Sequence, residues 1–370
     1  MADVLIAGAG PAGATLAIML GRAGLSVEVY DAHRFPREKP CGEGLMPSGV
    51  AVLERLGLRE AVGGRRVAGV RYHGFGLSAE SAFPDVDGAP ATMLAQRRLR
   101  LDETLVAAAR ATPGVRVFED ASVEGAAVEG GRAVGLRVGG DLRRGGLVVG
   151  ADGLGSRVRR SLGLDGRTGR ATRMGMRAHF RLAAGQTPPE HLEIFVAAGH
   201  ELYAAPLPDG ELLVAALCRG PELGGQPRAA LARWIAETPH LAALLDGAEP
   251  LTDVAGRATV AGRARAGFAP GAVLLGDAAR ATDPLTAGGL AHALVTAERL
   301  AALVPRALAD GDVWLRHFDA ERRRLLGAPA LLTDSLLALV KRPTLARGTL
   351  RLMRAWPRLM RRLLGVAAGI

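Results

Sequence analysis

Residues 1–31 read MADVLIAGAGPAGATLAIMLGRAGLSVEVYD, and this stretch decides the fold. A short apolar run over 4–7 leads into Gly8, Gly10 and Gly13, which are spaced as G-x-G-x-x-G. An apolar helical stretch follows to Arg22, and a second strand is expected over 27–30, which is followed by Asp31. A strand, a glycine turn, a helix and a second strand closed by an acid form the dinucleotide-binding fingerprint.

Each residue type in the fingerprint has a physical reason. Gly8 allows the tight turn, Gly10 lets the backbone approach a pyrophosphate, and Gly13 lets helix and strand pack closely. Pro11 suits the first helical turn, where a missing N–H costs nothing. The helix N-terminus faces the phosphates with free N–H groups, and Asp31 is placed to hold ribose hydroxyls. The alternative, a glycine-rich turn in an ordinary α/β protein, is the weaker interpretation because strand, helix and acid are in register.

Composition bounds the remaining possibilities. A length of 370 residues suggests two domains or one large interleaved unit, and 49% hydrophobic with 23% charged residues predicts a globular protein with a real core. The two cysteines, Cys41 and Cys218, are too few for a disulfide framework or a metal site, and they fit a reducing cytoplasm. The apolar start has no basic leader, so we do not expect a signal peptide or a membrane span.

Charge is distributed unevenly. The net charge is +10, but residues 341–370 carry eight cations and no acid, which leaves +2 for residues 1–340. The chain is therefore not a general nucleic-acid binder, and its basic character belongs to its end. These cations are Lys341, Arg342, Arg347, Arg351, Arg354, Arg358, Arg361 and Arg362.

Between residues 32 and 118 the pattern suggests a long functional loop and a helix with a basic start. The loop AHRFPREKPCGEGLMPSG over 32–49 is long for a compact domain, which usually marks function or disorder. A helix is predicted over 50–56, and another begins near Arg97, Arg98 and Arg100. Three cations beside a helix N-terminus oppose its dipole, so a bound anion or a nearby carboxylate is expected to match part of this charge. A solvated basic face is an equal alternative for Arg97 and Arg100.

Two later turns carry acids at the ends of apolar strands. Short strands are expected over 115–118, 121–128 and 133–138, and the next strand ends in Asp152 and Gly153 before a short helix. From 173 to 218 the pattern becomes strand-like, and helices follow over 228–245. A buried strand over 272–275 then ends in Gly276 and Asp277, where ligands bind in open α/β sheets. Asp277 as a simple helix cap is the alternative.

Taken together, the motifs resemble one superfamily. GAGPAG with Asp31, the KPCGEG loop, GADGLGSRVR over 150–159 and GDAARATDPLTAGGL over 276–290 occur in the order found in FAD-dependent monooxygenases of the p-hydroxybenzoate hydroxylase type, geranylgeranyl reductases and flavin-dependent halogenases. The resemblance extends to about residue 300. It departs from the reductases and halogenases at 286–289, which read TAGG in place of an acidic T-G-E-G run.

The resemblance implies FAD as the cofactor and assigns residues to it. Asp152 and Gly153 match the Asp-Gly motif associated with FAD, Asp277 matches the acid of the ribityl chain, and Pro284 begins the segment against the isoalloxazine ring. A single fingerprint means that NAD(P)H, if used, binds transiently without its own domain. The expected cofactor-binding residues are Gly8, Gly10, Pro11, Ala12, Gly13, Asp31, Ala32, Arg37, Cys41, Gly42, Arg98, Asp152, Gly153, Gly276, Asp277, Pro284, Gly288, Gly289 and Leu290.

The implied fold class is α/β, in an α+β two-domain arrangement with a Rossmann-like FAD-binding domain, an inserted antiparallel β-sheet substrate domain and a C-terminal helical region. The FAD-binding domain is expected over 1–75, 95–170 and 258–330, and the substrate domain over 76–94 and 171–257. Residues 331–370 are expected to form basic amphipathic helices.

The implied activity is oxidation or reduction of a small lipophilic molecule. The first interpretation is an FAD-dependent monooxygenase that uses NAD(P)H and O2 on an aromatic or polyketide-like substrate, in secondary metabolism. The alternatives are an alkene reductase that resembles geranylgeranyl reductase and acts on an isoprenoid, and a non-catalytic flavin-binding protein at a membrane. Halogenation is not expected, because Trp234, Trp314 and Trp356 form no W-x-W-x-I-P signature.

Four residues are expected to take part in catalysis: Cys41, His179, Tyr203 and Pro284. Arg177 and Glu193 are further candidates on the predicted sheet. Because His179 alternates with apolar Ala178 and Phe180, a solvent-facing position for it is the alternative. Cys41 as a small packed residue is the alternative to a reactive thiol. No metal ligands are expected.

The C-terminal pattern leaves two interpretations open. Arginines at 347, 351, 354, 358 and 361 recur at helical spacing between apolar residues, and Pro357 splits the stretch into two helices. The helices either dock on an anionic membrane surface or pack on the body with a solvated arginine stripe. The expected location is cytoplasmic, with the inner face of the membrane as the docking site in the first case, and the oligomeric state stays open.

Overall fold

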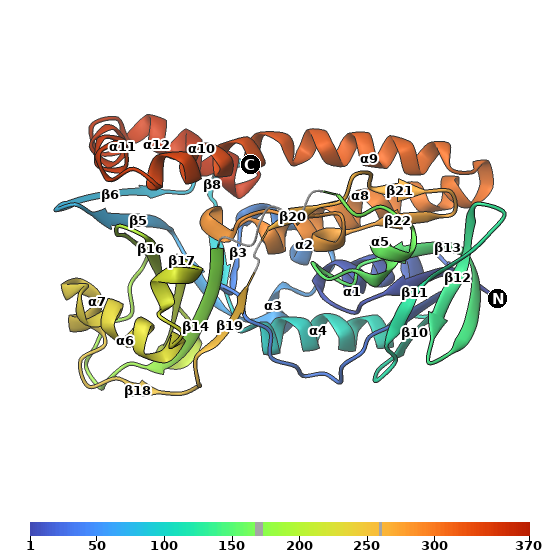
Figure 1. Ribbon diagram of the computed structural model, residues 1–370, viewed down its shortest axis with the longest axis horizontal. Helices are drawn as coiled ribbons and strands as arrows, with labels where there is room; N and C mark the ends of the chain where they lie inside the picture. The colour runs from blue at the N-terminus through green and yellow to red at the C-terminus, as the bar shows by residue number, and fades with distance from the viewer. Residues whose placement is uncertain (167–172, 259–260) are drawn as a thin grey trace.

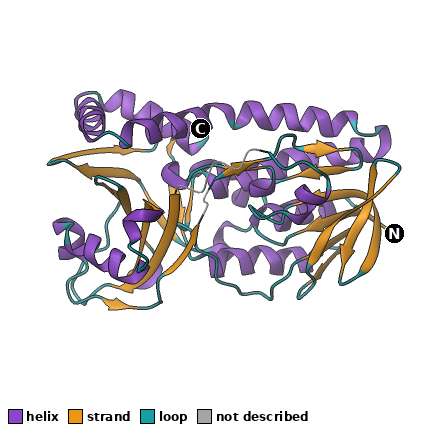
Figure 2. Cartoon of the chain, viewed as in Figure 1, coloured by secondary structure: helices purple, strands orange, loops and turns teal. Residues whose placement is uncertain are grey.

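The computed structural model describes residues 1–166, 173–258 and 261–370, and it has two lobes (Figure 1). One lobe is an α/β unit that contains the N-terminus, and the other is built around a large curved sheet. The long C-terminal helices run along one side of both lobes (Figure 1). Figure 2 shows strands in both lobes, with helices packed on each sheet. The α+β two-domain arrangement expected from the sequence is confirmed.

The central sheet of the α/β lobe has a parallel core with the N-terminal strand inside it. Its order is β10-β2-β1-β13-β12-β11, and β22 pairs with β13 in parallel while β21 pairs with β22. The strands are β1 (Ala2–Ala7), β2 (Val27–Tyr30), β10 (Val115–Phe118), β11 (Val123–Glu129), β12 (Arg132–Val138), β13 (Asp141–Gly150), β21 (Phe268–Ala269) and β22 (Ala272–Leu274). The carboxyl ends of β1, β13 and β22 therefore lie side by side, which brings the three predicted motifs to one edge.

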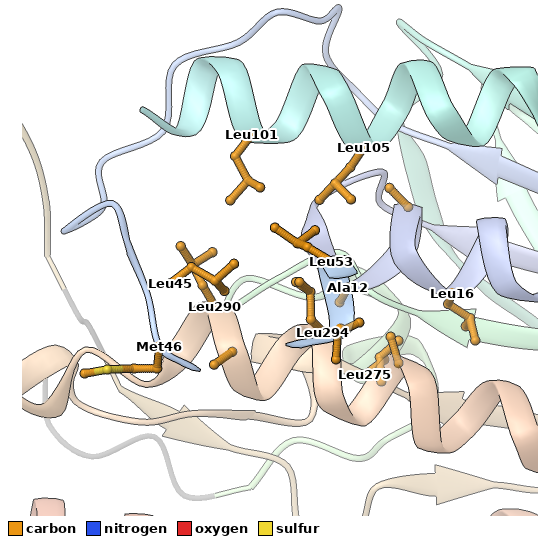
Figure 3. Close-up of a cluster of buried hydrophobic side chains, with 14 of the residues drawn as sticks. Ala12, Leu16, Leu45, Met46, Leu53, Leu101, Leu105, Leu275, Leu290 and Leu294 are labelled. Carbon is orange, nitrogen blue, oxygen red and sulfur yellow. The ribbon is translucent and has the colours of Figure 1, made fainter. Parts of the chain in front are cut away.

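Helices α1 (Pro11–Arg22), α4 (Arg98–Ala111) and α8 (Gly289–Asp310) pack together on one face of this sheet. Figure 3 shows the apolar side chains that join them: Leu101 and Leu105 of α4, Leu16 of α1 and Leu294 of α8. α2 (Pro47–Arg55) packs on α8 and starts three residues before its predicted position.

Two glycines make the close approach of α1 to β1 and β13 possible. A Cβ on Gly13 would lie 2.0 Å from the carbonyl oxygen of Gly8, and a Cβ on Gly8 would lie 2.5 Å from that of Ala151. Gly8 also has a φ of 98°, which favours glycine. Gly13 thus serves close packing and Gly8 the turn, as the sequence predicts, and Gly8 also allows the close approach to Ala151.

The second lobe is a mainly antiparallel sheet of order β18-β14-β17-β16-β15-β5-β6, with β19 also on β14 and one parallel pair, β5 with β15. Its strands are β5 (Gly69–Gly74), β6 (Leu77–Ala82), β14 (Arg173–Arg181), β15 (Leu192–Val196), β16 (His200–Pro206), β17 (Glu211–Arg219), β18 (Glu249–Pro250) and β19 (Ala255–Ala258). Because β5 pairs in this sheet, residues 69–74 belong to the second lobe, and the sequence-based boundary at residue 75 lies several residues too late.

Both faces of the second sheet are covered. On one face, α6 (Pro227–Ala236) and α7 (Pro239–Leu244) bury Leu231, Trp234 and Leu241 against it. The opposite face carries Tyr203, Ala215 and Leu217, which join the core of the α/β lobe. The middle of β14, residues 176–179, is therefore buried on both faces.

The C-terminal region forms α9 (Val313–Leu325), α10 (Gly327–Val340), α11 (Pro343–Ala355) and α12 (Pro357–Ala368), and the predicted break at Pro357 is confirmed. α11 and α12 pack on β6, and the chain end returns to the α/β lobe, where the Ser48 hydroxyl donates a 2.7 Å hydrogen bond to the Ala368 carbonyl. Among the described residues, no helix is both long enough and apolar enough to span a bilayer.

Short elements complete the fold. They are α3 (Arg59–Val62), α5 (Arg157–Ser161), β3 (Gly44–Leu45), β4 (Arg65–Val67), β7 (Asp85–Val86), β8 (Ala89–Pro90), β9 (Met93–Ala95), β20 (Gly262–Arg263) and β23 (Arg280–Ala281), with 3-10 turns at Gly276–Ala278 and Pro284–Thr286.

Candidate active site

A cavity of about 250 Å³ lies where the two lobes meet. Thirteen of the residues singled out in the sequence line it: Gly10, Pro11, Ala12, Cys41, Gly42, Arg98, Gly153, Tyr203, Gly276, Asp277, Pro284, Gly289 and Leu290. The second lobe contributes Met176, Arg177, Leu192, Ala215, Leu217 and Arg257. The three motifs and the KPCGEG loop thus converge on one space, as ligand sites at the ends of parallel strands do.

The glycine-rich turn is held in place by Asp31. The buried Asp31 carboxylate accepts hydrogen bonds from the backbone N–H groups of Ala9, at 2.8 Å, and His33, at 3.0 Å. It supports the turn rather than the cavity wall, and Ala32 beside it is exposed. Gly10 precedes α1 and leaves the helix N-terminus bare toward the cavity. This end of the site presents backbone N–H groups, which suit a pyrophosphate.

Cations surround the same end of the cavity. The buried Arg98 guanidinium donates two 2.7 Å hydrogen bonds to the carboxylate of Asp102, and Arg37 Nη2 lies 3.6 Å from that carboxylate. Burial alone would lower the pKa of Arg98, but Asp102 and the nearby Cys41 sulfur raise it overall. Burial, followed by the charge of Arg98, lowers the pKa of Lys39, which also lines the cavity. Asp102 is therefore the carboxylate that the sequence predicts beside the cations at the start of α4.

The three arginines at the start of α4 have separate roles. Arg98 faces the cavity, whereas Arg97 reaches the second lobe and forms a 2.7 Å ion pair with Glu211. Arg100 is exposed. The solvated-face interpretation therefore fits Arg100 and is wrong for Arg97, because β17 lies within reach of Arg97.

Glu43, which sequence reasoning missed, joins the lobes. Its buried carboxylate accepts a 3.1 Å hydrogen bond from the Arg98 backbone N–H at the start of α4, and its other oxygen lies 2.8 Å from His179 Nε2. The backbone of Glu43 has a φ of 55°, a strained conformation for a residue with a side chain. An acid between two glycines in KPCGEG was the available signal. Its strain and burial mark it as a positioning residue.

His179 is not where the sequence placed it. The side chain is fully buried, so the solvent-facing interpretation is wrong, and it does not itself line the cavity. The reason is that both faces of β14 are covered. Arg177, two residues earlier, does line the cavity and pairs with Glu38. Glu193 is also removed from the cavity, because its buried carboxylate pairs with Arg71 and His73.

The two residues of the Asp-Gly turn, Asp152 and Gly153, have different roles. Asp152 Oδ2 accepts hydrogen bonds from the backbone N–H groups of Arg157, at 2.7 Å, and Val158, at 3.2 Å, so it caps α5, while Gly153 lines the cavity. The buried Arg159, a second missed residue, donates to the carbonyls of Leu154, at 2.8 Å, and Ala278, at 3.1 Å. It ties the turn after β13 to the turn after β22. A buried arginine with two carbonyl partners is invisible from spacing alone.

The segment after β22 forms the opposite wall. Asp277 and Pro284 line the cavity, and Ala287 between them and α8 has a φ of 53°. Gly289 and Leu290 also line it, but Gly288 does not: a Cβ there would lie 2.8 Å from His292 Cε1. Gly288 therefore packs against the His292 ring and does not itself line the cavity. Burial and then Arg280 lower the pKa of His292 to about 4.

Cys41 and Tyr203 face the cavity from opposite lobes. Cys41 is a half-buried free thiol whose sulfur lies 3.4 Å from the Glu43 backbone nitrogen. The Tyr203 hydroxyl lies 3.4 Å from the Leu285 carbonyl oxygen, and burial, with Glu201 nearby, raises its pKa well above the ordinary value. Tyr203 therefore stays neutral near neutral pH.

A second, apolar cavity of about 30 Å³ adjoins the first and shares Leu192 and Ala287 with it. It lies between the second sheet and the C-terminal helices, whose contribution includes Leu336, Met353, Met360 and Leu364. Leu192 and Ala287 lie between the two cavities, and the lining of the smaller cavity is mainly apolar.

Comparison with known proteins supports a cofactor site in this cavity. Residues 1–328 match the family model described as FAD binding domain, and the chain belongs to that family. It is 32% identical over 320 residues to the menaquinone reductase of Mycolicibacterium smegmatis, covering 81% of this chain and 75% of the relative. It is 33% identical over 172 residues to the 6-methylpretetramide 4-monooxygenase of Streptomyces rimosus, covering 44% and 41%. A flavoprotein/dehydrogenase from Cytophaga hutchinsonii has the same fold, with a TM-score of 0.86, 23% identity and coverage of 100% and 92%.

The protein is thus an FAD-dependent oxidoreductase, and its cavity fits the cofactor. The bare N-terminus of α1 and the cations Arg37, Lys39 and Arg98 suit the pyrophosphate. Within the described part of the chain, the buried Arg37 Nε has no hydrogen-bond partner, which is a donor position left for a ligand. Asp277 and the Pro284–Leu290 segment would hold the flavin end.

Proposed function

We propose that this enzyme saturates a carbon–carbon double bond in an isoprenoid-bearing lipid. The observation that carries the proposal is the apolar cavity beside the cofactor cavity, which shares Leu192 and Ala287 with it and is lined on its other side by the C-terminal helices. An apolar chain suits this lining better than a polar group does. The sequence alone favours hydroxylation over reduction, and the apolar cavity reverses this preference.

The relatives support reduction. The relative that matches four-fifths of this chain is called a menaquinone reductase, and menaquinone is a quinone with a polyisoprenoid chain. The monooxygenase matches less than half of the chain. When bound and reduced, FAD supplies a hydride, and a proton must come from elsewhere. NAD(P)H as a transient reductant remains part of the proposal.

The chain's own residues orient the substrate and deliver that proton. Met176, Leu192, Ala215 and Leu217 provide an apolar wall that excludes water. Cys41 is the proton donor in this proposal, since its thiol lies in the cavity beside the KPCGEG backbone. Tyr203, neutral and close to the Leu285 carbonyl, fixes the position of the opposite wall.

The test uses FAD-loaded enzyme, reduced with dithionite under anaerobic conditions and mixed with menaquinone or a geranylgeranyl lipid in detergent. We expect a product that keeps two added hydrogen atoms by mass spectrometry after the quinol has been reoxidised in air, because dithionite alone converts a quinone to its quinol. Cys41→Ser should retain FAD and lose about a hundredfold in turnover, as loss of a general acid does. The control is Cys218→Ala, because Cys218 is buried in the second lobe away from the cavity. Turnover that is equal in both variants removes Cys41 from the mechanism.

Hydroxylation of an aromatic or polyketide-like substrate is the second candidate. Two arginines, Arg177 and Arg257, line the cavity and would hold a phenolate or another acidic ring substituent. The similarity to the 6-methylpretetramide 4-monooxygenase points the same way. Incorporation of labelled O2 into an aromatic product, dependent on NAD(P)H, would favour this candidate. FAD binding with neither reaction would favour a non-catalytic flavin-binding role.

A further inference from the structure

Helices α11 and α12, with the turn before α11, carry an exposed set of cations, which we call the basic surface: Lys341, Arg342, Arg347, Arg351, Arg354, Arg358, Arg361 and Arg362. All eight residues are exposed, and no acid occurs after Asp334. Within the described part of the chain, only Arg361 among them forms an ion pair, with Asp85 at 2.9 Å. The remaining charge is uncompensated by the protein itself.

Apolar side chains lie among these cations. Trp356 is 61% exposed at the junction of α11 and α12, and Leu345 and Leu352 of α11 are 42% and 43% exposed. The inner side of the two helices is already occupied, because Leu350, Met353, Met360 and Leu364 are buried. The outer apolar residues are therefore not the core-facing side of these helices.

We infer that the basic surface docks the enzyme on an anionic lipid bilayer, with Trp356 and the two leucines entering the headgroup region. Cations that interact with anionic headgroups contribute about 1 kcal/mol each near the surface. Tryptophan and leucine beside arginine are the residues of helices that lie in a bilayer interface. An acidic protein partner would match the same charge, and binding to anionic vesicles distinguishes it from a bilayer.

The position of the second cavity strengthens this inference. The apolar cavity lies beneath α10–α12 and is lined from their side by Leu336, Met353, Met360, Leu363 and Leu364. A lipid substrate would enter from this side, because the apolar cavity shares Leu192 and Ala287 with the cofactor cavity. This last step depends on the proposed function, whereas docking itself depends only on the surface.

The test measures sedimentation of the full-length, FAD-loaded protein with vesicles of phosphatidylcholine alone or mixed with phosphatidylglycerol. We expect binding to the anionic vesicles only, and release at high salt, since exposed charges are screened. R351Q/R354Q/R358Q should lower the vesicle affinity about a hundredfold, as loss of three contacts of about 1 kcal/mol each predicts. W356A should lower it by a smaller factor while leaving the salt dependence.

Point variants are used because deletion of the helices would uncover the apolar residues beneath them. The matched control is R66Q/R100Q/R137Q, which removes the same charge from exposed positions elsewhere. The control should bind vesicles like the unmodified protein. An equal loss of vesicle affinity in both triple variants would show that binding depends on net charge alone, and it would overturn the proposal. Failure of the unmodified protein to bind anionic vesicles would also overturn it and leave the surface to an acidic protein.

Turnover of detergent-solubilised substrate separates docking from the proposed function. A protein that binds vesicles but converts no lipid retains the docking inference and loses the function. A protein that converts solubilised lipid without vesicle binding loses the docking inference only.

Discussion

The protein has two groups of cations that differ in their burial and in their ion pairing. Around the cofactor cavity, Arg98 is 3% exposed and is held by two hydrogen bonds to Asp102. On the basic surface, Arg351, Arg354 and Arg358 are exposed and have no ion pair within the described residues. A buried cation needs a fixed partner because its desolvation is costly, whereas an exposed cation needs none. The first group therefore suits a ligand of defined shape, and the second suits a diffuse anionic surface.

The largest expected effect is on the buried pair. Asp102→Asn leaves the Arg98 charge buried without its counter-ion, and we expect a loss of about 3–5 kcal/mol in the free energy of unfolding. Denaturant titration followed by circular dichroism measures it, with flavin fluorescence reporting FAD release. Asp141→Asn is the control, because Asp141 pairs with Arg143 on the exposed surface. A loss at Asp102 no larger than at Asp141 would remove the distinction between the two groups.

The second effect concerns pH. The pKa of His292 is about 4 in the folded protein because of burial and the nearby Arg280, and about 6.5 when unfolded. The unfolded state thus binds the proton more readily, so this contribution to stability is complete above pH 6.5 and is lost as the pH falls toward 4, by up to about 3 kcal/mol. Unfolding measured across this range should show the slope, and His292→Gln should flatten it. An equal slope in the variant would assign the pH dependence to other groups.

The third effect tests whether α11 is an ordinary exposed helix. Gly348 lies inside α11, is exposed, and has no atom near the position of an added Cβ. Gly348→Ala should therefore raise the free energy of unfolding by about 0.5–1 kcal/mol through helix propensity. Destabilisation, seen by thermal denaturation, would mean that α11 has contacts on its outer side. FAD content should not change.

The smallest effect is expected for R351Q/R354Q/R358Q in the absence of vesicles. Exposed residues without partners change stability by less than about 0.5 kcal/mol when substituted. Thermal unfolding and the FAD-to-protein absorbance ratio should match those of the unmodified protein. Loss of FAD in this variant would show that the basic surface supports the fold and would make the two cationic groups alike.

The parts of the site that could be predicted are those written in local sequence. A glycine turn between a strand and a helix, or an acid at a strand end, is readable because its residues are neighbours in the chain. Gly10, Gly153, Asp277 and Pro284 all reach the cavity as expected.

The parts that could not be predicted depend on distant partners. Glu43 meets His179 across 136 positions, and Arg159 meets Ala278 across 119. Alternation along β14 suggested an exposed face, but it could not reveal that the α/β lobe covers that face. Gly288 and Gly289 are equivalent in the sequence, but in the fold the His292 ring packs against Gly288 and leaves Gly289 free of such a contact.

The strand order of the first sheet determines when each of its strands can pair during synthesis of the chain. β1, at residues 2–7, pairs with β13, at 141–150, and β22 joins at 272–274. During synthesis, β1 can pair with β2 early but waits for β13 on its other side, and the cofactor cavity closes only after residue 290 has emerged. Contacts of such long sequence separation form slowly, and an incomplete chain exposes apolar strand edges meanwhile. Nascent chains of this enzyme should depend on chaperone protection until their final quarter leaves the ribosome.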